Sequence, residues 1–447
     1  MIRTERLLEV CDRVLQLVGT ETEAEVTVTA GTGALTRFAT SFIHQNVVDD
    51  VQSVHLRVAA DGRVAEATAN QLDDDGLTTL VRSTLDAARL VPVDPGWPGL
   101  TSPAEPPAIE HWDDATAEAE PTSRAERVAA FVAAAGAYES AGYCSTEGTR
   151  VAFANSAGQR VAGRSTTAAL DGIARSGTSD GSARQASVSL ADLDGGVAGR
   201  DATERARFSA DATDLDPGQY EVLLSPSCVV NMLSFLALHG FNGRAVEEGR
   251  SFVELGELQF DPAISLADDV THPMSTGVPF DAEGTPKRRL ELVRDGVSMG
   301  LIHDRRTAQA LGESSTGNAV AGAGAYGAIP ANLVLEAGTS THDALIGRIE
   351  RGVIVTDFWY TRILDPRTQV VTGLTRNGVW LVENGKVVRP VTNMRFTQSF
   401  REALAPGAVN GVGSDLTLVA GGTFGIGAYA VPSLLLGSWN FTGGAKG

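Results

Sequence analysis

One apolar stretch near the middle of the chain carries the residues on which metal-dependent chemistry could depend. Between Ser225 and Gly240 the sequence has the length of a helix, one histidine, His239, and no carboxylate. A hydrolytic zinc centre needs about three protein ligands, an open position for water and a carboxylate that takes the proton of that water. One neutral imidazole does not meet these requirements, so the stretch predicts a helix without a complete metal site.

The cysteines do not complete such a site. They are Cys11, Cys144 and Cys228, and none follows His239 in the sequence. Their wide spacing forms neither a paired-cysteine metal motif nor a disulfide framework, which is typical of a reducing compartment. We expect a buried apolar role for Cys228 and a helix-end role for His239 beside Gly240.

Two glycine patterns match known motifs without the context that those motifs need. Residues 177–181 match G-x-S-x-G, which works only on a strained turn between a strand and a helix. Serine and glycine surround them, so we expect a flexible loop over residues 176–186. Residues 322–327 match G-x-G-x-x-G, but Pro330 follows where a dinucleotide-binding helix would have to begin. Both are interpreted as loops.

Composition and charge exclude several classes of function. With 55 acidic against 36 basic residues, the formal net charge is −19, and such a field repels a polyanion such as DNA. The longest apolar run, residues 229–238, is about half of a bilayer span, and the first residues lack the apolar core of a signal peptide. We therefore expect a cytoplasmic protein without nucleic-acid or membrane partners.

The 447 residues are enough for two or three domains. Apolar spacing predicts an α+β fold, with N-terminal units that resemble α/β sandwiches. Residues 1–91 form the first unit, and prolines make residues 92–121 a connector without regular structure. Residues 122–216 are expected to be a central helix followed by a strand meander. Residues 217–447 predict a large, strand-rich, mostly antiparallel domain.

Two local features are predicted inside the central unit. A capping box at Ser123 and Glu126 would open an alanine-rich helix that extends to about Ser140. The pair Glu147-Gly148 would form a turn between two strands of the meander.

The C-terminal half carries the most specific sequence pattern. In order and spacing, five of its segments resemble the PmbA/TldE pattern of the TldD/PmbA family of peptidases, once described as modulators of DNA gyrase. The N-terminal half agrees more loosely, so that the resemblance covers almost the whole chain. The five segments are residues 249–257, 280–286, 304–308, 315–319 and 330–333.

The resemblance indicates which family motif the apolar stretch at residues 225–240 corresponds to. Catalytic TldD-type members carry His-Glu-x-x-x-His at this point, with a downstream cysteine as the third zinc ligand. In this register Ser234 stands at the first histidine and Phe235 at the glutamate, and only His239 remains. The resemblance therefore implies a PmbA/TldE-type chain with no catalytic residue and no metal of its own.

The resemblance also implies a partner and a substrate. A TldD-type subunit would supply the zinc and the glutamate base, and this chain would help to enclose the chamber of a cytoplasmic heterodimer. Substrates in the family are unfolded or short peptides, including leader peptides. We expect substrate contacts at the turn formed by Ser315, Thr316, Gly317 and Asn318, and at residues 322–327.

Three points stay open at this stage. The segment around Phe358 is more aromatic than the small residues expected of the bacterial type, which leaves the subgroup and the substrate undecided. The chain could also be a self-sufficient peptidase, in which the fold brings an aspartate or glutamate to His239. A regulatory protein that binds a toxin, an antitoxin or a topoisomerase without proteolysis is the third alternative.

Overall fold

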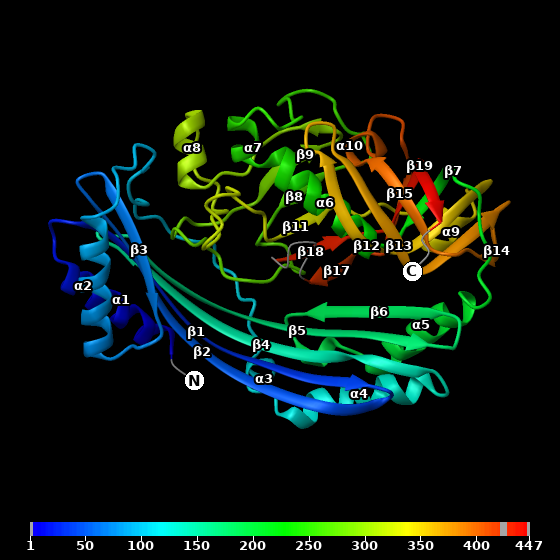
Figure 1. Cartoon of the computed structure of the whole chain (residues 1–447), viewed down its shortest axis with the longest axis horizontal. Helices are drawn as coiled ribbons and strands as arrows, with labels where there is room; N and C mark the ends of the chain where they lie inside the picture. Colours follow the sequence, from blue (N-terminus) through cyan, green and yellow to red (C-terminus); the bar gives the residue numbers. More distant parts are fainter. Residues whose placement is uncertain (1–2, 421–426, 445–447) are drawn as a thin grey trace.

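The structure, a computed structural model, describes residues 3–420 and 427–444. A long, curved sheet built from the N-terminal half lies beneath a second, strand-rich body built from the C-terminal half (Figure 1). This arrangement confirms the predicted α+β class and the mostly antiparallel C-terminal domain. Among the described residues, no helix is long and apolar enough to cross a membrane.

The N-terminal sheet has six strands in the order β3-β2-β1-β4-β5-β6, all paired antiparallel. The two N-terminal units that the sequence suggested separately share this sheet, because β1 pairs with β4 from Glu25↔Asn155 to Phe38↔Gly142. The strands are β1 Glu23–Ala39, β2 Phe42–Ala60, β3 Arg63–Ala69, β4 Glu139–Asn155, β5 Arg160–Arg175 and β6 Asp180–Ser187.

Four local predictions in this half are wrong. The connector expected to lack regular structure contains the short helix α3 Asp114–Ala117, which Asp113 caps by accepting a hydrogen bond from the N–H of Thr116. Glu147-Gly148 is no turn, because both residues continue the β4 ladder opposite Gly33 and Thr32 of β1. Most of the expected serine and glycine loop is strand β6, which pairs with β5 at the edge of the sheet.

The fourth error concerns the central helix. This helix, α4 Pro121–Ala135, begins two residues before the expected capping box, with Pro121 in its first turn, where a missing N–H costs nothing. It ends at Gly136, whose φ of +61° lies in the left-handed region, so that Ser140 already belongs to β4.

Side chains alternate along the strands between two faces of the sheet, one covered by helices and one not covered by them. Even-numbered residues of β1, such as Val26, Val28 and Phe38, point to the face on which the helices pack. Odd-numbered residues of β4 and β5, such as Tyr143 and Asp171, point the other way, toward the C-terminal body. The helices are α1 Thr4–Val18, α2 Asp74–Ala88, α3 Asp114–Ala117, α4 and α5 Gly195–Phe208.

Within the described residues, the C-terminal body contains two sheets. In one of them the pairings β12–β7–β19–β15–β13–β12 close a ring of five strands, in which only β7 and β12 run parallel. Its strands are β7 Gly218–Leu224, β12 Arg351–Asp365, β13 Val370–Glu383, β15 Met394–Ser399 and β19 Leu434–Gly444, with β14 Lys386–Pro390 and β16 Val409–Val412 attached.

The second sheet has the order β10-β9-β8-β11-β18-β17. Its short strands are β8 Leu266–Asp268, β9 Leu290–Arg294, β10 Val297–Ser298, β11 Leu333–Leu335, β17 Thr417–Ala420 and β18 Ala428–Val431. Short helices flank the two sheets: α6 Pro226–Leu236, α7 Gly243–Glu247, α8 Arg305–Leu311, α9 His342–Ile346 and α10 Phe400–Ala403.

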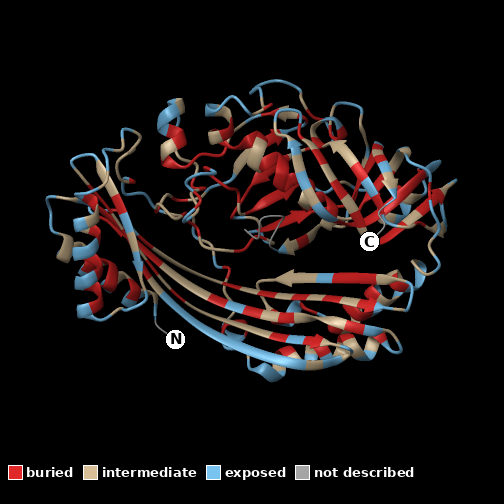
Figure 2. Ribbon diagram, viewed as in Figure 1, coloured by how far each residue is buried: buried red, intermediate tan, exposed pale blue. Residues whose placement is uncertain are grey.

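The largest core lies in the C-terminal body around α6. Buried residues are concentrated there, whereas much of β2 is exposed (Figure 2). Trp439 is fully buried and packs against Phe358, Phe396 and Phe400, with ring centroids 5.3–5.7 Å apart. Such aromatic packing contributes stability beyond the buried area alone. It also holds Phe358 of β12 against the core, in the part of the strand that lines the first groove cavity.

Candidate functional site

A groove separates the uncovered face of the N-terminal sheet from the C-terminal body. It consists of adjoining cavities of about 480, 730 and 380 Å³. Trp359 lines both the first and the second cavity, and Tyr143 and Leu418 line both the first and the third. The shared walls make the three cavities one continuous groove.

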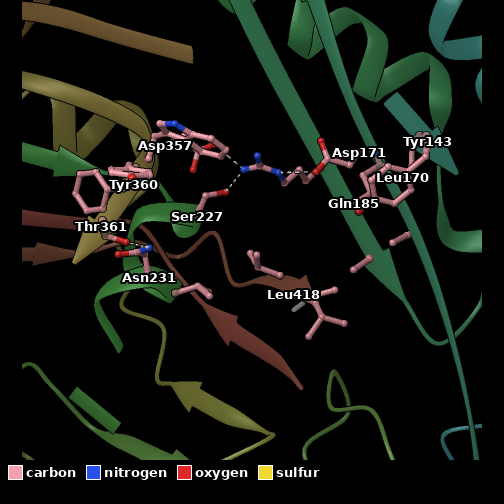
Figure 3. A pocket seen from close by; sticks show the side chains of 18 residues that line it. Tyr143, Leu170, Asp171, Gln185, Ser227, Asn231, Asp357, Tyr360, Thr361 and Leu418 are labelled. Carbon is pink, nitrogen blue, oxygen red and sulfur yellow. Dashed lines mark hydrogen bonds and ion pairs between the residues drawn. The ribbon is translucent and has the colours of Figure 1, made fainter. Parts of the chain in front are cut away.

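An arginine bridges the groove beside the first cavity. Arg184 of β6 donates from Nε to Asp171 of β5 over 2.9 Å and from Nη1 to Asp357 of β12 over 2.8 Å (Figure 3). Burial lowers the pKa of Arg184, but Asp357 and Asp171 outweigh burial and hold this pKa above its usual value. Burial raises the pKa of Asp357, and Arg184 opposes this effect. The contact therefore ties the sheet to the C-terminal body as an ion pair.

Helix α6 presents one face to the groove. Ser227, Val230 and Asn231, spaced three and four residues apart, line the first cavity. Asn231 Nδ2 donates to Thr361 Oγ1 of β12 over 3.0 Å. Proline in the first turn of α6 fixes where the helix begins. The start of the helix in turn determines which of its side chains face β12.

The motif positions lie further along α6, outside the cavity walls. Ser234 is buried, donates to the carbonyl of Val230 over 2.8 Å and hydrogen-bonds to Tyr429. Phe235 is buried against Phe400, with ring centroids 5.9 Å apart. Ser234 and Phe235 therefore have structural environments in the core.

His239 lies in a π-helical turn, Ala237–Phe241, that extends α6. Its ring stacks on Phe235 at a centroid distance of 6.1 Å. Burial and the nearby charge of Arg250 lower its pKa, which favours the neutral imidazole. The pKa of the Cys228 thiol is raised by burial, and its Sγ lies 3.5 Å from the carbonyl oxygen of Val355.

The donor set does not fit zinc. Within residues 3–420 and 427–444, no group of three or more histidine, cysteine, aspartate or glutamate side chains is placed to hold a metal ion. A phenyl ring at Phe235 offers no ligand atom and no base, and the Cys228 thiol is kept protonated by its apolar surroundings. We therefore derive no catalytic step through a metal on this chain.

Comparison with known proteins identifies the family. The family model described as the PmbA/TldA metallopeptidase C-terminal domain matches residues 217–443, which is half of the chain. The chain belongs to the TldD/PmbA metallopeptidase family. Over 197 residues it is 26% identical to a "Metalloprotease TldD homolog" of Haemophilus influenzae, covering 43% of this chain and 40% of that protein.

A second curated relative is a "Metalloprotease" of Methanothermobacter thermautotrophicus. It is 26% identical over 231 residues, which cover 50% of this chain and 49% of that protein. The chain thus spans about half the length of the curated relatives that it matches, or less.

Solved structures of the family show the same fold. TldE from Thermococcus kodakarensis superposes with a TM-score of 0.87 at 19% identity, covering 98% of this chain and 99% of that one. A putative modulator of a DNA gyrase from Thermotoga maritima gives a TM-score of 0.85 at 19% identity, with 97% and 99% covered. At these identities the likeness concerns the fold.

The turn expected to contact substrate is held by its own hydrogen bonds. Asn318 is buried and donates from Nδ2 to Asp268 Oδ2 over 2.6 Å, while Thr316 Oγ1 donates to Asn318 Oδ1 over 2.7 Å. Ser315 Oγ donates to the carbonyl of His303 and accepts from the N–H of Gly317, both over 3.4 Å, and Gly317 supplies a φ of +79°. Residues 315–318 line none of the three groove cavities, and substrate contact at this turn stays a prediction.

The glycine loop at residues 322–327 lies beside α7. Gly322 and Gly327 have positive φ angles, and Asn242 donates to the carbonyl of Tyr326 over 2.7 Å. This loop also lines none of the three groove cavities, and its expected role in substrate binding stays untested.

The sequence did not point to the groove residues that the fold brings together. Asp171, Arg184 and Asp357 come from three different strands, and only the strand register reveals that they meet. The one available signal was the aromatic segment after Asp357, because Trp359 and Tyr360 line the groove.

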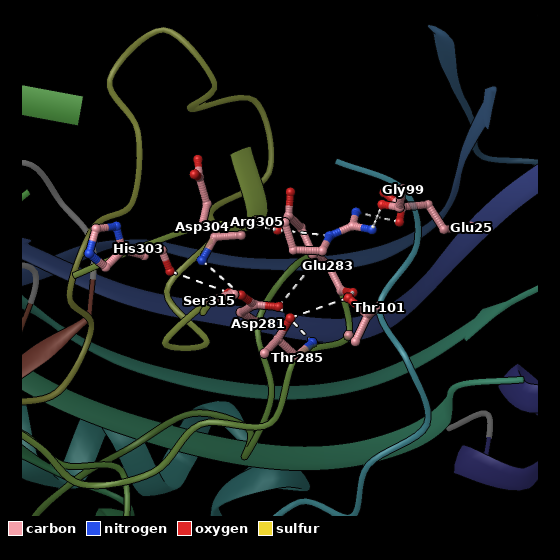
Figure 4. Close-up of polar contacts among 12 residues, drawn as sticks. Glu25, Gly99, Thr101, Asp281, Glu283, Thr285, His303, Asp304, Arg305 and Ser315 are labelled. Carbon is pink, nitrogen blue, oxygen red and sulfur yellow. Dashed lines mark hydrogen bonds and ion pairs between the residues drawn. The ribbon is translucent and has the colours of Figure 1, made fainter. Parts of the chain in front are cut away.

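A second contact between the two bodies, here called the joint, is built from charged side chains, of which Glu25 and Arg305 are buried. Arg305 of α8 donates to Glu25 of β1 over 2.6 Å and lies 3.1 Å from Glu283 (Figure 4). Arg57 of β2 donates to the other oxygen of Glu25 over 2.7 Å. The connector takes part, because Thr101 Oγ1 donates to the carbonyl of Glu283 over 2.7 Å. The joint therefore fixes how the two bodies enclose the groove.

Proposed function

We propose that the chain is a non-catalytic, TldE-type subunit that joins a TldD-type zinc metallopeptidase and helps to hold unfolded or short peptides. The observation that carries this proposal is the environment of the motif positions: Ser234 and Phe235 are buried in the core, and His239 stands apart from any group of metal ligands within the described chain. The metalloprotease relatives and the TldE fold support the same assignment.

The groove supports peptide binding. Strands β6 and β17 are the edge strands of their sheets, and both contribute to the wall of the first cavity. Edge strands bind extended peptides through backbone hydrogen bonds, while cavities between side chains supply selectivity. A groove with two such strands suits an extended chain better than a folded domain.

Strand β2 offers a surface for the partner subunit. Its neighbour β3 pairs only with residues 54–60, so among the described strands nothing pairs with the outer edge of residues 42–53. Exposed valines, including Val48 at 54% exposure, lie along this edge. Such an edge is a template for another chain.

The charges on this edge favour pairing with a strand of a different protein over pairing with a second copy of this chain. Asp49 and Asp50 lie close to its middle, so two identical edges paired antiparallel would bring four carboxylates together. A TldD-type strand with basic or amide side chains avoids this repulsion. We therefore assign the β2 edge to the TldD-type partner.

Metal analysis of co-purified subunits tests the proposal. The isolated chain is expected to contain no stoichiometric zinc, and its complex with the TldD-type protein of the same genome is expected to contain about one zinc per heterodimer. One equivalent of zinc in the isolated chain would contradict the proposal. Failure to form a complex would favour the regulatory alternative.

A further inference from the structure

Two consecutive aromatic side chains project from β12 into the groove. Trp359 is 53% exposed and lines the first two cavities, and Tyr360 is 64% exposed and lines the first. Large apolar side chains that gather at the surface of a cavity mark a binding site more often than a folding requirement.

An irregular backbone turns both rings outward. In a regular strand, neighbouring side chains point to opposite faces, so that one of the two would face the core. The pairing of β12 with β13 shifts between Trp359 and Arg362, and Tyr360 has a φ of +57°. A non-glycine residue in the left-handed region costs about 1–3 kcal/mol and persists where the surrounding structure supports it, most often at functional sites.

An arginine guanidinium lies over each of the two rings. The guanidinium of Arg376 lies 4.2 Å from the ring centroid of Trp359, and that of Arg362 lies 4.4 Å from the ring centroid of Tyr360. Arg362 Nη2 also donates to the hydroxyl of Tyr360 over 2.6 Å. Stacking restricts the guanidinium planes, and the other N–H groups at their edges can donate to a carboxylate.

Neither arginine is neutralised within the described residues. No carboxylate oxygen there lies within 4.0 Å of Arg362 or Arg376, although acidic residues outnumber basic ones in the chain. The other groove arginines do have partners: Arg184 pairs with Asp171 and Asp357, and Arg175 pairs with Asp180 over 2.6 Å. Arg376, which lines the second cavity, and Arg362, which follows the cavity-lining Thr361 without lining a cavity itself, are therefore cations beside the groove that have no carboxylate partner within the described residues.

We propose that Trp359, Tyr360, Arg362 and Arg376, here called the aromatic-arginine platform, form a subsite that selects acidic segments of extended peptides. An aspartate or glutamate would accept charge-assisted hydrogen bonds from the guanidinium edges, and an adjacent apolar side chain would pack on the exposed rings. The net charge of −19 repels a nucleic acid, which carries a charge on every phosphate, more strongly than a peptide with one or two carboxylates. The inference rests on the proposed function only in that the groove binds peptides.

Peptide binding to the intact chain, alone and in complex with the TldD-type protein, tests the platform. Three fluorescent decapeptides would be compared that are identical except for glutamate, glutamine or lysine at one central position. The platform predicts that the glutamate peptide binds about tenfold more tightly than the glutamine peptide, which is the effect expected of one charge-assisted contact. The lysine peptide should bind most weakly.

Matched variants locate the effect. The double variant Arg362→Gln/Arg376→Gln should remove the preference for glutamate while it leaves binding of the glutamine peptide within about twofold. Arg351→Gln is the control, since Arg351 is an exposed arginine on the same strand and pairs with Glu383. Circular dichroism and thermal unfolding would show that the double variant folds.

The outcomes separate this inference from the proposed function. Equal binding of the glutamate and glutamine peptides, or a preference that survives in the double variant, overturns the platform and leaves the proposed function intact. Tighter binding of a single-stranded oligonucleotide than of any peptide also overturns it. Failure of all three peptides to bind either the chain or the complex overturns the proposed function itself.

Discussion

Arg305 and Glu25 form a buried ion pair of 2.6 Å although 280 positions separate them in the sequence. Their side chains are 8% and 4% exposed, and they connect α8 of the C-terminal body to β1 of the N-terminal sheet. Burial raises the pKa of Glu25, and the charges of Arg305 and Arg57 oppose this effect. The pair holds the two walls of the groove in place.

Removing one partner of this pair should destabilise the protein strongly. Arg305→Ala leaves Glu25 buried with one cation fewer, which is expected to cost about 3–5 kcal/mol in the free energy of unfolding. Arg306→Ala is the matched control, because Arg306 and its partner Asp94 are 40% and 27% exposed, and such pairs contribute about 0–1 kcal/mol. Denaturant unfolding measures both changes, and equal changes would contradict this view of the joint.

Acid should weaken the same network through Glu66. His55, whose Nε2 lies 3.6 Å from Glu66 Oε2, and Arg57, which donates from Nε to Glu66 over 2.9 Å, lower the pKa of Glu66 to about 2. Since this folded-state pKa is below the ordinary value of 4.5, the contribution is complete above pH 4.5 and is lost as the pH falls toward 2. The difference in stability between the wild type and Glu66→Gln should therefore shrink between pH 5 and pH 2 in denaturant titrations. A constant difference would contradict the assignment.

Restoring the motif residues should not restore a metal site. Phe235→Glu places a carboxylate in the core beside Phe400, which is expected to cost about 4 kcal/mol or more. Phe235→Leu keeps the position apolar and should cost clearly less. Metal analysis of the double variant Ser234→His/Phe235→Glu is expected to detect no bound zinc, because no downstream cysteine is present. Stoichiometric zinc in this variant would show that a hidden third ligand exists.

The exposed edge of β2 should be required for the partner and dispensable for folding. Val48→Lys changes an exposed side chain, so its effect on the free energy of unfolding should stay within about 0.5 kcal/mol. Size-exclusion chromatography with the TldD-type protein should show loss of the complex. Val387→Lys, on the exposed strand β14, is the control and should leave the complex intact. Complex formation by Val48→Lys would place the interface elsewhere.

The fold class followed from local patterns in the sequence, whereas the groove did not. Apolar spacing predicted the α+β class, and the apolar residues Leu7, Val10 and Val14 of α1 are buried against the sheet. The break expected at Glu147-Gly148 failed because pairing with β1 outweighs the turn preference of a single glycine.

Contacts between distant strands explain why the groove was not predicted. Arg184 and Asp357 meet only because β6 and β12 face each other across the groove, 173 positions apart in the sequence. The sequence shows an aromatic segment around Phe358, but the exposure of Trp359 depends on a shift in strand pairing that residue types do not predict. Local patterns thus predicted elements, and the site arises from their assembly.

Proteolysis by separated and mixed subunits tests the central claim most directly. The purified chain, the TldD-type protein of the same genome and their mixture would each receive an unfolded protein substrate, with and without a chelator. The account predicts cleavage that requires the mixture and that the chelator abolishes. Cleavage by this chain alone would contradict it and would reveal a catalytic site outside the positions of Ser234, Phe235 and His239.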